Sequence, residues 1–140
     1  MAPATAGAFS FWTLNLTRYL CVLIGGGLGA LARYVVGVAV SAWYAGRFPL
    51  ATFLINISGS FLIGLLATIF TARLPTTHPN WRLLLITGVL GGFTTFSSFE
   101  YESLMTVKAG NSQLALAYIL CSVGVGYLAA WLGVWLVLKR

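Results

Sequence analysis

Four long apolar stretches, joined by short connections, constrain the fold of this chain more than any other feature. They cover about residues 19–44, 50–70, 83–107 and 114–138. A helix crosses the hydrocarbon core of a bilayer with about 20 mostly apolar residues. Lipid cannot pair with backbone groups, so only helices and closed barrels cross it. The chain is 59% hydrophobic and 7% charged, which is outside the range of soluble domains. The sequence therefore predicts an all-α integral membrane protein, with residues 1–140 forming a single transmembrane domain of four helices.

The basic residues are scattered singly near the ends of these stretches. The formal net charge is +6, but nucleic-acid binding needs a basic patch or stripe. Single cationic side chains at span ends are typical of interfacial anchors beside anionic headgroups. The residues concerned are Arg18, Arg47, Arg73, Arg82, Lys108, Lys139 and Arg140. We expect membrane lipid and no nucleic acid as a partner.

Other features of the chain carry no predicted chemistry. Residues 1–17 have neither a basic n-region nor a clear cleavage site, so the first span is expected to act as its own insertion signal. Cys21 and Cys121 both fall inside apolar runs, which predicts neither a disulfide framework nor a metal site. His78, the only histidine, lies between two prolines of the second connection and is expected to be a solvated loop residue.

The third apolar stretch contains an unusual segment, Gly88–Phe99. A Gly91-Gly92 pair is followed at once by hydroxyls interleaved with phenylalanines. This pattern predicts a helix that is broken near its middle. Backbone outside a helix is tolerated at membrane depth only where protein buries it or a wet cavity bathes it, and in transport proteins such breaks mark ion and substrate sites. The alternative is that the glycines only let two helices pack closely.

Polar and small residues recur every four positions in the other three spans, which places each set on one helix face. The sets are Gly25, Gly29, Arg33 and Gly37 in the first span, Thr52, Asn56, Ser60 and Gly64 in the second, and Tyr118, Ser122 and Gly126 in the fourth. Arg33 on such a seam is expected to face a cavity or a partner, unless it snorkels to the headgroups. Asn56 and its hydroxyl neighbours indicate a polar track for a small ion, although an amide can also tie two helices together at ~0.6–2 kcal/mol.

The balance of these polar groups favours an anion. The donors are mainly neutral, with one arginine and no acid at mid-span. Glu100 and Glu102 are the only carboxylic side chains; both are expected near the membrane face, where Glu102 could also face a water-filled vestibule. No nucleophile and base accompany them, so an enzyme is not predicted. Four spans are too few to surround a pore comfortably, so we expect a homodimer.

Three motifs resemble those of the Fluc (CrcB-type) fluoride channels of microbes. They are Gly29-Ala30-Leu31-Ala32-Arg33-Tyr34, Asn56-Ile57-Ser58-Gly59-Ser60-Phe61, and Gly91-Gly92-Phe93-Thr94-Thr95-Phe96-Ser97-Ser98-Phe99 followed by Glu102. The similarity covers all four spans in order, and the third motif is highly specific.

The resemblance implies an antiparallel, dual-topology homodimer in the plasma membrane (the inner membrane of a prokaryotic cell). It would hold two fluoride pores, each built from both chains, and would export fluoride to lower its cytoplasmic level and give resistance. A structural sodium ion at the dimer centre would be held by the main-chain carbonyls of Gly91 and Thr94. The pathway residues implied by the family are Arg33, Asn56, Phe96, Phe99, Tyr118 and Ser122.

The chemistry of fluoride agrees with this implication. The ion is small and strongly hydrated, so a selective path replaces its water with close donors, and Asn56, Thr95, Ser98 and Ser122 supply neutral ones. A phenylalanine ring edge is the positive end of its quadrupole and can join them. Weak donors let the ion leave again, as conduction requires.

The sequence departs from the family in small ways, and two other readings compete. Ser98 stands where threonine is common, which keeps the hydroxyl. Five basic residues flank the side that holds both termini and two the other side, a bias towards cytoplasmic termini that opposes dual topology. A small multidrug transporter would need an acid in the first span, where Arg33 stands. A membrane scaffold would explain the glycine seams but not the hydroxyl and phenyl segment.

Overall fold

The computed structural model describes residues 16–139, and all of their regular structure is helical. The elements are α1 (Leu16–Trp43), α2 (Leu50–Thr68), η2 (Ile69–Arg73), α3 (Pro79–Arg82), η3 (Leu83–Leu90), α4 (Gly91–Phe93), α5 (Phe96–Lys108) and α6 (Ser112–Leu138). They make four helical segments that are long and apolar enough to cross a membrane, Leu16–Trp43, Leu50–Arg73, Pro79–Lys108 and Ser112–Leu138. The four predicted membrane spans are confirmed. The expectations for Arg140 and for a leader sequence concern chain outside the described residues.

The observed bounds extend the predicted spans by a few residues. The third span begins at Pro79, before the predicted 83, because local signals there start a helix. Pro79 occupies the first helical turn, and the Nδ1 atom of His78 accepts a hydrogen bond from the backbone N–H of Asn80 at 3.2 Å. Proline is favoured at this position because its missing N–H would be unpaired anyway. His78 is exposed, as expected of a solvated loop residue, and its side chain caps the helix that follows.

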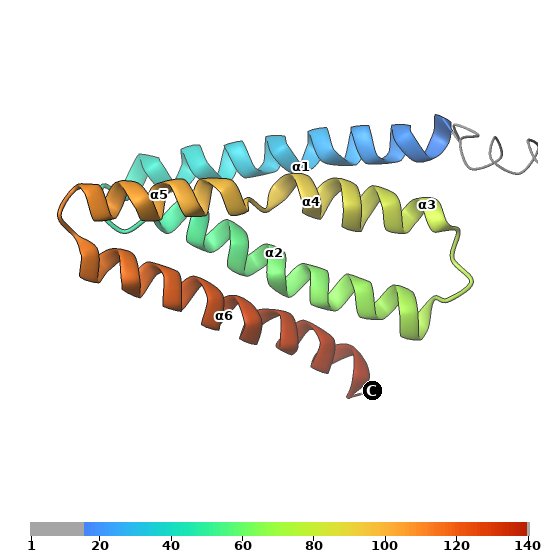
Figure 1. Ribbon diagram of the computed structural model, residues 1–140. Coiled ribbons are helices and arrows are strands. Elements are labelled where there is room, and N and C mark those ends of the chain that lie inside the picture. Colours follow the sequence, from blue (N-terminus) through green and yellow to red (C-terminus); the bar gives the residue numbers. More distant parts are fainter. Residues whose placement is uncertain (1–15, 140) are drawn as a thin grey trace, which may run out of the picture.

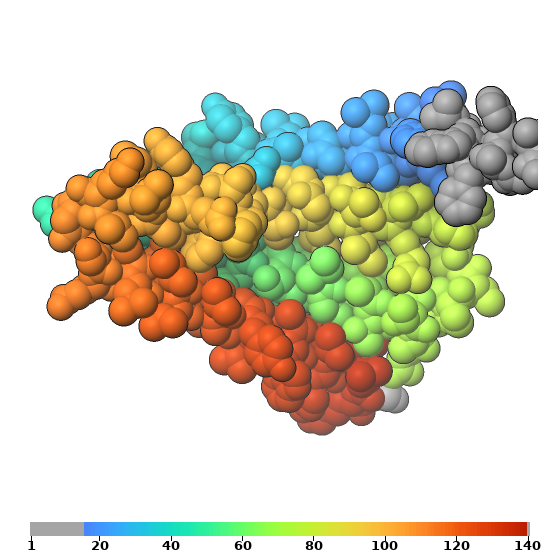
Figure 2. Space-filling view, viewed as in Figure 1, coloured from blue at the N-terminus to red at the C-terminus, as the bar shows by residue number. Residues whose placement is uncertain are grey.

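The four spans lie side by side in two closely packed pairs. α1 runs along η3 and α4, and α2 packs chiefly against α6 (Figure 1). α2 also touches the third span, so that it lies between the third span and α6. Figure 2 shows α2 recessed between these two neighbours. Large apolar side chains remain exposed along all four spans, which suits a protein surrounded by lipid.

Glycines at the crossings allow this close packing. A Cβ on Gly29 would collide with the carbonyl oxygen of Val89, and one on Gly25 with that of Leu84. In the other pair, a Cβ on Gly64 would collide with the carbonyl oxygen of Ala130. These three glycines of the predicted seams therefore form helix contacts, as is common where lipid gives helices no hydrophobic reason to associate.

Gly133→Val is expected to destabilise the protein, whereas Gly124→Val in the same helix is not. A Cβ on Gly133 would collide with the carbonyl oxygen of Phe61 and lie 2.7 Å from the backbone nitrogen of Leu65, whereas Gly124 has nothing within 4 Å. Overpacking of this kind costs about 1–3 kcal/mol. Thermal unfolding of the two variants in detergent measures the difference, and equal melting temperatures would contradict the packing described here.

Candidate functional site

The helical backbone of the third span is interrupted at two residues. Thr94 (φ −76°, ψ 158°) and Thr95 (φ −150°, ψ 116°) are extended, between the end of α4 at Phe93 and the start of α5 at Phe96. Gly91 and Gly92 are helical, so the interruption follows the glycine pair and lies within the Gly88–Phe99 segment in which a break is predicted. Glycine costs a helix only about 1 kcal/mol, and Gly92 is held by packing because a Cβ there would collide with the carbonyl oxygen of Gly26.

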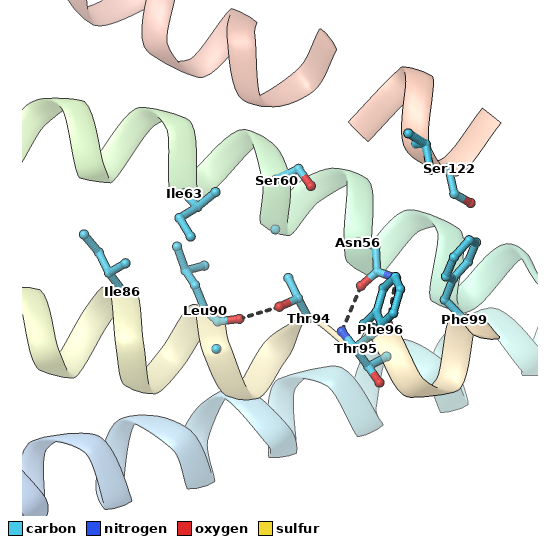
Figure 3. Close-up of a pocket in the computed structure, with 13 residues that line it drawn as sticks. Asn56, Ser60, Ile63, Ile86, Leu90, Thr94, Thr95, Phe96, Phe99 and Ser122 are labelled. Atoms are coloured by element: carbon cyan, nitrogen blue, oxygen red, sulfur yellow. Dashed lines mark hydrogen bonds between the residues drawn. The ribbon is translucent and has the colours of Figure 1, made fainter. Parts of the chain in front are cut away.

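Asn56 pairs with the backbone of Thr95 through both ends of its amide. The backbone N–H of Thr95 donates to Oδ1 of Asn56 at 2.9 Å, and Nδ2 of Asn56 donates to the carbonyl oxygen of Thr95 at 3.0 Å (Figure 3). Both main-chain groups of an extended residue are thereby satisfied inside the membrane span, where an unpaired group would cost about 1–3 kcal/mol. Asn56 is a tie between helices, and its second amide hydrogen stays available as a donor.

The hydroxyls of the two threonines also have local partners. Thr94 Oγ1 donates to the carbonyl oxygen of Leu90 at 3.0 Å. Thr95 Oγ1 accepts from the backbone N–H of Ser98 at 3.3 Å, as the cap of α5, and lies 2.9 Å from Ser98 Oγ. Capping by a threonine hydroxyl stabilises a helix start by about 1 kcal/mol, which explains why α5 begins directly after Thr95.

Arg33 points towards the same interruption. Its Nη1 atom donates to the carbonyl oxygen of Thr94 at 3.3 Å, and the residue is half-buried. The guanidinium therefore contacts the third span, and the alternative of snorkelling to the headgroups does not describe it. A permanent positive charge lies beside the extended backbone.

A cavity of about 370 Å³ opens beside Thr94 and Thr95, between the third span, α2 and α6 (Figure 3). Its lining residues are Asn56, Gly59, Ser60, Ile63, Ile86, Leu90, Gly91, Thr94, Thr95, Phe96, Phe99, Ser122 and Val123. The hydroxyl oxygen of Ser122 is buried and has no hydrogen-bond partner within residues 16–139. Buried polar atoms are rarely left unpaired. The Ser122 hydroxyl can therefore donate a hydrogen bond to a polar ligand in this cavity.

Three aromatic rings, of which two line this cavity, pack against one another in a row. Phe96 is 70% exposed, whereas Phe99 is 8% and Tyr118 0% exposed. The ring centroids of Phe96 and Phe99 are 5.8 Å apart, and those of Phe99 and Tyr118 are 5.2 Å apart. Of the predicted site residues, Asn56, Thr95, Phe96, Phe99 and Ser122 line the cavity together with Gly91 and Thr94, while Arg33, Ser98 and Tyr118 contact lining residues without lining it.

A second polar cluster adjoins Tyr118. The carboxylate of Glu102 accepts from Thr52 Oγ1 at 2.7 Å and from the hydroxyl of Tyr118 at 3.0 Å. Glu102 also lines another cavity, of about 550 Å³, near the connections between spans. The other residues that line it are Arg47, Pro49, Met105, Thr106, Ala109 and Asn111. Glu102 therefore bonds to two neighbouring helices and also lines this second cavity.

Sequence reasoning missed the bonds within this cluster, although a signal for them was present. Thr52 lies four residues before Asn56, and Tyr118 lies four residues before Ser122, on the same helix faces. An acid on the third span beyond the threonine pair therefore meets donors from both neighbouring helices.

Tyr118→Phe is expected to destabilise the fold more than Tyr127→Phe in the same helix. The first change removes a donor to the half-buried Glu102 carboxylate, and a hydrogen bond to a charged group contributes about 1.5–3 kcal/mol. Tyr127 is 71% exposed and serves as the matched control. The change in melting temperature of each variant in the same detergent measures the effect. Equal losses would show that the bond to Glu102 contributes no stability.

Comparison with known proteins places this chain in a family. Residues 20–134 match the model of the CrcB-like protein, Camphor Resistance (CrcB) family. The chain is 49% identical to a protein of Solibacter usitatus over 116 residues, which cover 83% of this chain and 94% of the relative. It is 48% identical to a protein of Acidobacterium capsulatum, over 83% of this chain and 92% of the relative. Both relatives are named fluoride-specific ion channel FluC.

These similarities agree with the helical spans and with the resemblance seen in the motifs. The relatives are named as ion channels, and neither as enzymes nor as drug exporters. Four spans and an ion-channel family together describe a multi-pass membrane protein, which in prokaryotes lies in the plasma membrane. The chain belongs to the CrcB-like family.

Proposed function

We propose that this protein is a fluoride channel that lets the ion leave the cell, lowers its cytoplasmic level and so gives resistance to it. The support comes from relatives at 49% and 48% identity that carry the name fluoride-specific ion channel. The observation that carries the proposal for this chain is the cavity at Thr94 and Thr95. It is lined by the hydroxyl of Ser122, which has no hydrogen-bond partner among the described residues, and by the exposed ring of Phe96.

The cavity offers weak, neutral donors to a small anion. Among the described residues, neither the Ser122 hydroxyl nor the second amide hydrogen of Asn56 donates a hydrogen bond, so both can donate to a bound ion. The edges of the Phe96 and Phe99 rings carry the positive part of the aromatic quadrupole. Arg33 adds a positive charge nearby without itself lining the space. Such a path can strip the hydration shell in steps and still release the ion.

The conducting form is an antiparallel, dual-topology homodimer with two pores. The support is an exposed surface on the third span of the single chain. Phe96 is 70% exposed, and the space beside Gly91 is free, because a Cβ on this glycine would meet only the carbonyl oxygen of Ile86, at 3.9 Å. A second copy laid across the third span would cover both and close the cavity into a conduit. In this arrangement the interruption at Thr94 and Thr95 lies near the dimer centre.

A sodium ion at the dimer centre is held by the carbonyl oxygens of Gly91 and Thr94. In an unbroken helix the N–H of Thr95 would bond to the carbonyl of Gly91, but here it bonds to Asn56. Similarly, the N–H of Ser98 bonds to Thr95 Oγ1 and leaves the carbonyl of Thr94 to Arg33 at 3.3 Å. A carbonyl has two lone pairs, so Thr94 can accept from Arg33 and still contact an ion. Hard oxygen donors of this kind suit a hard cation.

Fluoride efflux from loaded proteoliposomes, followed with a fluoride-selective electrode, tests the proposal. We expect rapid efflux that needs no proton gradient, and no comparable efflux from vesicles loaded with chloride. Drug-driven proton exchange without fluoride efflux would instead identify a small multidrug transporter. A protein that transports neither substrate would be a scaffold. The mass of the purified protein in detergent tests the homodimer separately.

A further inference from the structure

We propose that a basic pocket at one end of the bundle binds the phosphate of an anionic phospholipid headgroup. The pocket lies between α1 and the start of the third span and has a volume of about 380 Å³. It is lined by Arg18, Pro79, Arg82, Leu83, Ile86 and Thr87. The two guanidinium groups come from different helices and share one concave space.

The chain has no acidic side chain at hand to neutralise this pocket. Glu100 and Glu102 are its only carboxylic side chains, and both lie in α5. α5 begins at Phe96, so about 20 Å of helix separates it from Arg82 at 1.5 Å per residue. Two like charges that line one pocket repel one another, and an external anion between them relieves the repulsion.

The other arginines of the described chain already have acceptors. Arg33 donates to Thr94, Arg47 to Asn111, and Arg73 to the carbonyl oxygen of Val137. Within residues 16–139, the side chains of Arg18 and Arg82 donate to no protein atom. Among the described residues no acceptor competes with a ligand for these donors, and the planar guanidinium matches the oxygens of a phosphate in pairs.

The position of the pocket selects a lipid over a free phosphate ion. Arg18 lies in the first turn of α1, which begins at Leu16, and Trp81 beside Arg82 is 54% exposed. Tryptophan gathers at the level of the headgroups. Leu83 and Ile86 continue the pocket along the third span with apolar side chains, which would lie against an acyl chain. A basic pocket between transmembrane helices is a known type of lipid site.

Titration of phosphatidylglycerol into neutral detergent micelles, read as thermal stabilisation of the purified protein, tests this site. We expect the melting temperature to rise with phosphatidylglycerol but not with phosphatidylcholine. The variant R18Q/R82Q should need about 30-fold more anionic lipid for half of the effect, because each basic residue near an anionic surface contributes about a factor of five. The variant R47Q/K108Q removes the same charge from the other end and should behave like the wild type.

Two further arms keep the proposal open to refutation. Inorganic phosphate should give no stabilisation at matched concentration; an equal rise with phosphate alone would overturn the lipid assignment. Equal weakening in R18Q/R82Q and R47Q/K108Q would reduce the effect to general surface charge and overturn the site. If R18Q/R82Q does not fold, R18K/R82K keeps the charge but loses the paired donors, and it should bind more weakly than the wild type; unchanged binding would contradict a guanidinium site.

Discussion

Fluoride efflux should fall to the leak of protein-free vesicles when Phe96 is replaced by isoleucine. The ring of Phe96 lines the cavity and is 70% exposed in the single chain, so its loss removes a polarised ring edge from the path. Isoleucine fills a similar volume but offers an anion no positive edge. An unsolvated ion then meets an apolar surface, and a barrier increase of ~3 kcal/mol slows passage about 100-fold. Electrode recordings of efflux measure the rate directly.

Tyr101→Ile is the matched control for this change. Tyr101 lies in the same helix, is 64% exposed and does not line the cavity. We expect it to leave efflux unchanged, and both variants to elute as the same dimer on gel filtration. Unchanged efflux in Phe96→Ile would count against the cavity as the fluoride path, even if the wild type conducts fluoride.

Asn56→Leu should have a second large effect, on both flux and stability. Leucine keeps the approximate volume of the side chain but removes both bonds to the backbone of Thr95, at 2.9 and 3.0 Å. Two unpaired main-chain groups cost about 1–3 kcal/mol each. We therefore expect a lower melting temperature and a fluoride efflux reduced at least about 10-fold.

Ser58→Ala controls for a polar substitution in the same helix. The hydroxyl of Ser58 donates to the carbonyl oxygen of Leu54 within α2, and Ser58 does not line the cavity. Its replacement should change neither efflux nor melting temperature. An Asn56→Leu protein with wild-type efflux would show that the extended backbone at Thr95 has no part in conduction.

The sequence predicted the spans well because bilayer thickness and apolar length set them together. It predicted the contact of the first span only in part: Gly25 and Gly29 contact the third span, in the row that also carries Arg33. Gly37 continues that row by spacing, yet nothing lies within 4 Å of it. Periodicity defines the face of a helix, but the length over which a neighbour follows that face depends on the crossing of the two helices.

The position of the extended residues could not be predicted from glycine alone. Gly92 packs against Gly26 of α1, and this contact keeps it helical. The hydroxyl of Thr95 and the amide of Asn56 stabilise the extended residues that follow. Likewise, the bonds of Glu102 to Thr52 and Tyr118 depend on the rotation and depth of three helices at once. The residue pattern of a single helix gives neither its rotation nor its depth relative to its neighbours.

The pairing of Asn56 with Thr95 has a consequence for how the third span can behave. The amide of Asn56, in α2, bonds to both the N–H and the carbonyl of Thr95. If the third span became a continuous helix, this amide would lose both partners. The interruption is thus stabilised from outside the third span, by a side chain of α2. The packing of α2 against the third span therefore also sets the shape of the cavity wall at Thr94 and Thr95.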